Sequence, residues 1–193
     1  MITEEKMKQL FGKREVVATG IGTALFVVLT TVEIPLGFVP KTALQPRMAV
    51  LAFIAGVFGP IAGALTGLLG HAIGDVIFYG SIWWSWVFPE AVVGLCIGLF
   101  HNKYAIKDGN FANPVSIIYF NVIQAAANAV AWIAAAPVLD ILVYQEPVNK
   151  VFAQGFFAFI GNTIVIGIMG SALAVAYSAV AGKPSDNTNT GGG

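Results

Sequence analysis

The chain has 193 residues, of which 57% are hydrophobic and 10% are charged. Because soluble domains carry about 25% charged residues, this composition excludes an ordinary soluble domain. Ten basic and ten acidic residues give a net charge near zero, so nothing indicates a nucleic-acid partner.

Long apolar stretches separated by short polar gaps dominate the sequence. A bilayer core about 30 Å thick requires roughly 20 apolar residues in a helix. The runs do not alternate between apolar and polar residues, as the strands of a membrane β-barrel would. We therefore predict an all-α integral membrane protein, a compact bundle of six transmembrane helices. The expected helices are at about 16–32, 46–58, 60–79, 83–101, 115–139 and 151–181.

These runs predict one membrane domain over residues 1–182, followed by a flexible tail at 183–193. Residues 1–15 are charged and are expected to form an interfacial lead-in. No A-x-A-like cleavage site follows the first apolar run, so we expect no cleaved signal peptide.

The distribution of Lys and Arg predicts the orientation in the cell membrane. With six spans, seven basic residues lie on one side and three on the other, so both termini are expected in the cytoplasm. The loops at 33–46, 80–82 and 140–150 then face outside. The larger group contains Lys6, Lys8, Lys13, Arg14, Lys103, Lys107 and Lys183, and the smaller contains Lys41, Arg47 and Lys150.

The first expected helix carries two pairs of small residues, Ala18 with Gly22 and Gly20 with Ala24. Small residues at i, i+4 allow a second helix to approach closely. At 100° per residue the two pairs face opposite ways, about 200° apart. Either one pair packs internally while the other meets a partner, or both serve ordinary internal packing.

The loop at 33–46 is too apolar for an idle solvent loop. Its apolar residues are Ile34, Leu36, Phe38 and Val39. They either fold back over the bundle as a lid or pack at the membrane interface.

Ionisable residues gather near the outer end of the third and fourth helices. Gly67, His71 and Asp75 follow one another at i, i+4 steps. At 1.5 Å per residue, Asp75 lies about 6 Å and His71 about 12 Å below the outer boundary, with Glu90 about 10 Å deep. Exposing such groups to lipid costs several kcal/mol, so we expect them to face the interior. They form either an outward-facing binding site or a polar network that fixes the helix register.

The connection after the third helix is rich in aromatic residues, and the fifth helix carries a stripe of amides ending at Trp132. Aromatic faces and a few polar groups are typical of a ligand site, although amides also bond between helices. Asn162 lies deeper in the sixth helix. The candidate substrate-binding residues are His71, Asp75, Tyr79, Trp83, Trp84, Trp86, Glu90, Asn128 and Gln154.

No catalytic motif is present. The chain lacks a Walker A loop, H-E-x-x-H and G-x-S-x-G. His71 and His101 are expected on opposite sides of the membrane and cannot share a metal, and the single Cys96 excludes an internal disulfide. We therefore expect no catalytic residue, no metal site and no cofactor.

Three strings suggest a family: FGPIAG at Phe58–Gly63, GHAIGD at Gly70–Asp75 and YGSIWWSW at Tyr79–Trp86. With GIGTALFVVL in the first helix, they resemble the substrate-binding (S) component of energy-coupling factor (ECF) vitamin transporters. The resemblance implies six helices, no enzyme activity of its own, and a membrane partner, the T component, with two cytoplasmic ATPases. It also implies that small residues of the first helix, among Ala18, Gly20, Gly22 and Ala24, dock on the T component.

The subgroup looks like one that includes cobalamin carriers, and its relatives are often labelled riboflavin transporters. Cobalamin is therefore the expected substrate, with riboflavin or another vitamin as the alternative. Two other readings remain: a stand-alone secondary carrier that uses His71, Asp75 and Glu90, or a structural membrane protein. Inverted repeats would favour the carrier, but GHAIGD has no counterpart in the other half.

Overall fold

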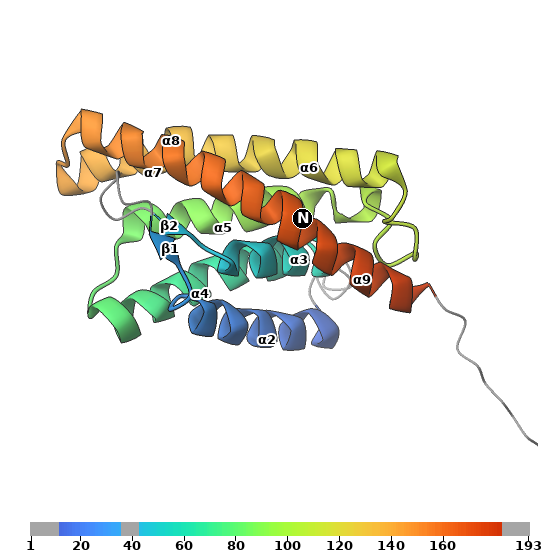
Figure 1. Ribbon diagram of the computed structural model, residues 1–193. Coiled ribbons are helices and arrows are strands. Elements are labelled where there is room, and N and C mark those ends of the chain that lie inside the picture. The colour runs from blue at the N-terminus through green and yellow to red at the C-terminus, as the bar shows by residue number, and fades with distance from the viewer. Residues whose placement is uncertain (1–11, 36–42, 183–193) are drawn as a thin grey trace, which may run out of the picture.

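The computed structural model describes residues 12–35 and 43–182, and in this part of the chain it is almost entirely helical (Figure 1). Three of the helices are long and apolar enough to cross a membrane: Pro60–Tyr79, Pro114–Tyr144 and Val148–Ala181. The prediction of an all-α membrane protein is confirmed.

The described residues form six helical segments. The first four are α2 (Lys13–Leu29), α3 (Arg47–Phe58), α4 (Pro60–Tyr79) and α5 (Trp84–Leu99). The fifth runs through α6 (Pro114–Asn128), the π-helical η2 (Ala129–Ala135), α7 (Ala136–Leu139) and the π-helical η3 (Asp140–Tyr144). The sixth runs through α8 (Val148–Val165), the π-helical η4 (Ile166–Gly170) and α9 (Ser171–Ala181). A short 3₁₀ turn, η1 (His101–Lys103), follows α5.

The helix boundaries correct two expectations. The fifth segment continues to Tyr144, so residues 140–144 are helical rather than part of an outer loop. At the N-terminus, α2 begins at Lys13, and the Gly12 N–H donates to the Glu15 carboxylate at 3.0 Å. Residues 13–15 therefore belong to the first helix. Residues 1–11 of the expected lead-in, and the tail at 183–193, lie outside the described residues.

Glycine and proline set the ends of α4. Gly59 has φ of 93° and Gly80 has φ of 77°, values that favour a residue without a side chain. Pro60 occupies the first helical position, where its missing N–H is not needed. Because Gly59 turns the chain within a single residue, α3 and α4 follow each other with almost no loop.

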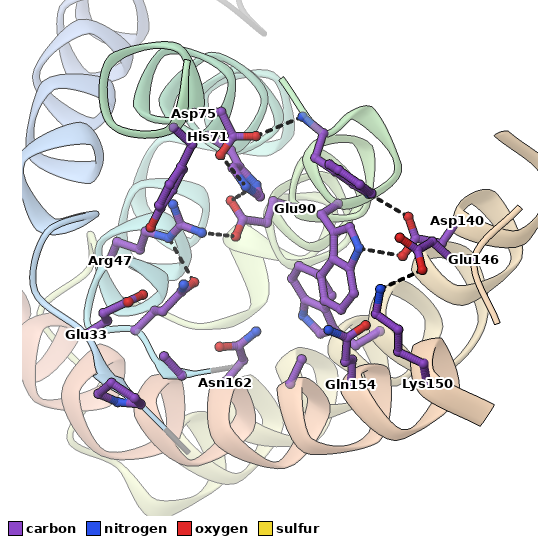
Figure 2. A pocket seen from close by; sticks show the side chains of 18 of the residues that line it. Glu33, Arg47, His71, Asp75, Glu90, Asp140, Glu146, Lys150, Gln154 and Asn162 are labelled. Carbon is purple, nitrogen blue, oxygen red and sulfur yellow. Dashed lines mark hydrogen bonds and ion pairs between the residues drawn. The ribbon is translucent and has the colours of Figure 1, made fainter. Parts of the chain in front are cut away.

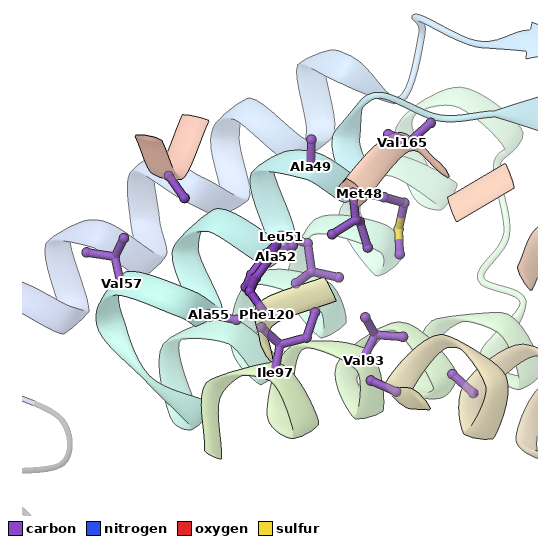
Figure 3. Close-up of a cluster of buried hydrophobic side chains, with 14 of the residues drawn as sticks. Met48, Ala49, Leu51, Ala52, Ala55, Val57, Val93, Ile97, Phe120 and Val165 are labelled. Atoms are coloured by element: carbon purple, nitrogen blue, oxygen red, sulfur yellow. The ribbon is translucent and has the colours of Figure 1, made fainter. Parts of the chain in front are cut away.

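The short helix α3 forms the centre of the molecule. Side chains on every side of it are buried, including Met48, Leu51 and Val57. They pack with Val93 and Ile97 of α5 and with residues of the C-terminal helices (Figure 3). A helix that is apolar all round is typical of such a buried position. In Figure 1, α2 lies along one side of the molecule and the two long C-terminal segments lie along the other.

Backbone contact holds α4 against α5. A Cβ atom added to Gly63 would lie 2.6 Å from the Gly94 carbonyl oxygen, and one added to Gly67 would lie 2.7 Å from that of Glu90. Only glycine permits this approach. The contact fixes Glu90 of α5 beside the polar stripe of α4.

The two small-residue pairs of α2 have different environments. Ala18 and Gly22 are buried, and a Cβ on Gly22 would lie 2.7 Å from Ile54. Gly20 and Ala24 are exposed, and no atom lies within 4 Å of the position of a Gly20 Cβ. The first alternative of the sequence analysis therefore describes the packing: one pair faces the bundle, and the other faces outward.

A short antiparallel pair of strands precedes α3. β1 (Ile34–Pro35) pairs with β2 (Ala43–Leu44), with Ile34 opposite Leu44. The Leu44 side chain occupies the space beside Gly161 of α8, 2.6 Å from where a Cβ would be. The strand β2 thus packs against the sixth segment. Residues 36–42, including Leu36, Phe38 and Val39 of the expected lid, lie outside the described residues.

Candidate functional site

A cavity of about 720 Å³ lies between the ends of α4, α5 and the two long C-terminal segments, with the β1–β2 strands on another side. Figure 2 shows its polar residues pointing toward a common space. Its walls differ in chemistry: one is charged, one is aromatic, and α8 contributes amides.

The charged wall is a chain of buried ionisable groups. Arg47 Nη2 lies 3.2 Å from Glu90 Oε1. His71 bridges two carboxylates, with Nδ1 3.1 Å from Glu90 Oε2 and Nε2 3.4 Å from Asp75 Oδ1. The other Asp75 oxygen accepts the backbone N–H of Trp83 at 3.0 Å. Buried charges require such partners, and the charged layer expected from the sequence is therefore assembled from three helices.

Arg47 also joins this wall to α2. Its Nη1 donates to the hydroxyl of Thr30 at 3.1 Å, and its guanidinium lies 4.8 Å from the centre of the Phe26 ring. Its Nε donates to Gln45 at 3.0 Å. With only 4% of its surface exposed, Arg47 is a structural cation. The sequence placed Arg47 among the three basic residues on the expected outer side. Its burial shows that it is an internal cation rather than a surface charge, and the predicted orientation is the same when it is left out of the smaller group.

The aromatic wall is held by a carboxylate that the sequence analysis missed. Asp140, 2% exposed, accepts the indole N–H of Trp83 at 2.7 Å and that of Trp86 at 2.9 Å. It also accepts a short hydrogen bond from Ser85. The Trp83 ring stacks on Tyr144 with centroids 4.5 Å apart. Both tryptophans therefore have fixed ring planes at the cavity.

The wall continues with Trp132, whose ring lies 5.5 Å from that of Trp86. The Trp132 indole N–H donates to Asn128 at 3.0 Å. Asn128 in turn bonds to Gln124, and Gln124 bonds to Asn121 and to the Thr163 carbonyl. The amide stripe is thus a ladder behind the wall.

The sixth segment contributes Gln154, Ala158 and Asn162 to the cavity. The Asn162 side chain is 4% exposed, and no hydrogen bond joins its amide to another residue of the described chain. A buried amide without a partner loses free energy. Asn162 therefore offers both a donor and an acceptor to a molecule in the cavity.

The outer rim carries further charges. Glu33 precedes β1, and Glu146 pairs with Lys150 at 2.5 Å. Glu146 and Lys150 border the cavity where the chain passes between the fifth and sixth segments, whereas Glu33 borders it beside β1. No group of three His, Cys, Asp or Glu residues within 12–35 and 43–182 is arranged to hold a metal ion.

The structure brings seven of the nine candidate residues to the cavity and leaves two outside it. The seven are His71, Asp75, Tyr79, Trp83, Trp86, Glu90 and Gln154. Trp84 is 41% exposed and stacks on Phe88, so it does not line the cavity. Asn128 is buried behind Trp132. Their direct contact with a ligand is no longer expected.

Three residues of the cavity were not among the predicted site residues: Arg47, Asp140 and Asn162. Asp140 interrupts an apolar run, and a carboxylate in such a run is a functional candidate by default. The signal is absent from a helix predicted to end at residue 139, because Asp140 then belongs to a loop. Arg47 at the start of a helix and Asn162 within a long apolar helix carried weaker signals of the same kind.

Comparison with known proteins gives consistent matches. A family model described as "ECF-type riboflavin transporter, S component" matches residues 11–179. A UPF0397 protein of an Exiguobacterium strain is 48% identical over 169 residues, which are 87% of this chain and 91% of the relative. A UPF0397 protein of Streptococcus gordonii is 48% identical over 176 residues, covering 89% and 94%. One from Staphylococcus aureus is 46% identical over 173 residues, covering 89% and 93%. No solved structure matches the chain.

Proposed function

Because this chain belongs to the ECF-type riboflavin transporter S-component family, we propose that its cavity captures a flat heteroaromatic vitamin of the riboflavin type. Membership makes it a membrane-embedded, vitamin-binding subunit of a transporter. It favours this role over a stand-alone carrier or a purely structural protein.

The observation that carries the proposal is the combination of aromatic faces and a free amide in one cavity. The partly exposed rings of Trp83 and Trp86 line the cavity, and a flat conjugated ring can stack against aromatic rings of this kind. The unpartnered amide of Asn162 is complementary to a ring edge with an adjacent N–H and C=O, because it can accept from one and donate to the other. A flavin ring has both features.

Cobalamin, the substrate expected from the sequence, is not supported. The matching family is named for riboflavin. A cavity of about 720 Å³ falls within the roughly 300–1,000 Å³ typical of drug-sized ligands. A corrinoid with its nucleotide arm is much larger than such ligands.

For the partners, we propose a T component in the membrane and two cytoplasmic ATPases, since the chain has no Walker A loop of its own. The outward pair Gly20 and Ala24 is the docking position, because it leaves room for another helix. Ala18 and Gly22 are already occupied by internal packing.

The test is a binding titration on the purified subunit in detergent. Riboflavin should quench tryptophan fluorescence with saturable binding, and Asn162→Leu should weaken its affinity by tenfold or more, which is about 1.4 kcal/mol. Trp84→Ala is the matched control, because Trp84 lies outside the cavity, and should bind like the parent. Absence of saturable binding by the parent would reject a riboflavin-type substrate. Equal affinity of Asn162→Leu and the parent would reject the cavity assignment.

A further inference from the structure

Every tryptophan of the aromatic wall gives its indole N–H to a protein acceptor. Trp83 and Trp86 donate to Asp140, and Trp132 donates to Asn128. An indole has a single donor and no acceptor. None of these three N–H groups is therefore available to a ligand, and the wall offers ring surface alone.

Asp140 is an unusual residue for the outer end of an apolar helix. A buried carboxylate costs free energy unless hydrogen bonds compensate for the lost water. Here its two oxygens receive three donors from the beginning of α5, two indoles and the Ser85 hydroxyl. No Lys, Arg or His lies in ion-pair contact with Asp140 among the described residues. The neutral donors that surround it belong to the aromatic wall.

Asn128 holds the third indole of the aromatic wall, as Asp140 holds the other two. Its side-chain oxygen accepts the Trp132 N–H, while its nitrogen donates to the backbone and side chain of Gln124. The amide is held in one orientation by these bonds. Its oxygen is consequently aimed at the indole, which fixes the Trp132 ring about 5.5 Å from Trp86.

We propose that Asp140 and Asn128 are positioning residues for the substrate: they hold three indole rings so that flat faces, and no polar edges, meet the ligand. This inference rests on the proposed function. Hydrogen bonds to the ligand then come from other groups, with Asn162 foremost. The wall would select ligands by the area and flatness of their rings.

The hydrogen bonds of the indole N–H groups can be tested without a ligand, because the chain has only four tryptophans and each gives one indole resonance. Protein labelled with ¹⁵N at the indole nitrogen, in lipid nanodiscs, should give four resonances, assigned by single Trp→Phe variants. Asp140→Asn replaces one acceptor oxygen by an NH₂ donor. It should shift the resonance of Trp83, Trp86 or both and speed exchange of that proton at least tenfold, with Trp84 unmoved. Asn128→Ala should shift Trp132.

The second readout is riboflavin affinity. Asp140→Asn should raise the Kd at least tenfold and Asn128→Ala at least threefold. Asp108→Asn makes the same chemical change on the exposed loop after η1. This control should keep the indole resonances and a Kd within twofold of the parent.

Unmoved indole resonances in both variants, or shifted resonances with an unchanged Kd, would overturn the inference. Failure of both variants to fold would also count against it, since the two residues would then be scaffold. If only Asp140→Asn fails to fold, the indole resonances and the Kd of Asn128→Ala decide whether the inference holds. A parent protein that binds no riboflavin would reject the proposed substrate, while the resonances would still show whether Asp140 and Asn128 hold the indole rings.

Discussion

The α4–α5 pair and the two long C-terminal segments pack by different means. Along α4 and α5, glycines at 63, 67, 94 and 98 bring backbone against backbone. The C-terminal segments are interrupted by three π-helical stretches, Ala129–Ala135, Asp140–Tyr144 and Ile166–Gly170. There, a Cβ atom added to Gly155 would lie 2.1 Å from the Trp132 carbonyl oxygen, and elsewhere side chains, including the amide ladder, make the contact.

The difference separates two tasks at one cavity. Close backbone packing leaves little freedom, so it suits the charged wall, where a misplaced Glu90 would lose its ion pairs with Arg47 and His71. π-Helical turns are often found at functional sites. Two of them contain Trp132 and Asp140, which form and hold the aromatic wall. The closely packed α4–α5 pair thus holds the charged wall, and the irregular segments shape the aromatic surface for the ligand.

The largest effect is expected at the charged wall. Arg47→Met removes the cation and leaves the Glu90 carboxylate buried beside His71 alone. Breaking a buried ion pair in this way costs about 3–5 kcal/mol, measurable as a fall in unfolding temperature in detergent. Removing the second charge as well, in Arg47→Met/Glu90→Leu, should recover much of the loss. If the double variant is no more stable than the single one, the pair is not the source of the effect.

The second-largest loss of stability is expected at the glycine contact between α4 and α5. Gly94→Val places a branched side chain 2.3 Å from the Gly63 carbonyl oxygen. Overpacking of this kind costs about 1–3 kcal/mol, or more where backbone must move. Gly20→Val is the control on a free helix face, and its unfolding temperature should stay near that of the parent. Equal destabilisation by both changes would show that helix propensity rather than contact is responsible.

A smaller loss is expected in the irregular segments. Gln124→Leu cuts the amide ladder between Asn121 and Asn128. Hydrogen bonds between membrane helices average about 0.6 kcal/mol and reach about 1.7, so this variant should remain folded and show a small drop in unfolding temperature. A loss as large as that of Gly94→Val would remove the contrast between the α4–α5 pair and the irregular segments.

The smallest effect on stability, with a clear effect on assembly, is predicted on α2. Gly20→Leu and Ala24→Leu project outward and should leave unfolding temperature and riboflavin affinity unchanged. They should weaken co-purification with the T component, because the added side chain prevents close helix approach. Normal assembly by both variants would exclude this face from docking.

Much of the fold was predictable from local composition. The length of the apolar runs predicted the helices. The predicted helix at 60–79 matches α4 because Gly59, Pro60 and Gly80 set its ends locally. His71 and Asp75 were predicted to adjoin because four residues on one helix return to the same face. The helical rise per residue predicted that His71, Asp75 and Glu90 lie at similar depths in the bundle.

Other features depended on contacts between distant segments. No local signal shows that Arg47 turns inward to Glu90, or that Trp86 faces the cavity while Trp84 faces out. The sequence also does not show that Gly20 and Ala24 lie on the outward face of α2. Those outcomes depend on how each helix is rotated against its neighbours. Past Ala129, π-helical turns change the angle per residue, so a stripe traced at 100° does not continue to Asp140. The sequence by itself determined which segments are helical and which groups share a helix face. Only the tertiary structure decided which groups meet across helices, because packing sets the rotation, the depth and the local winding of each helix.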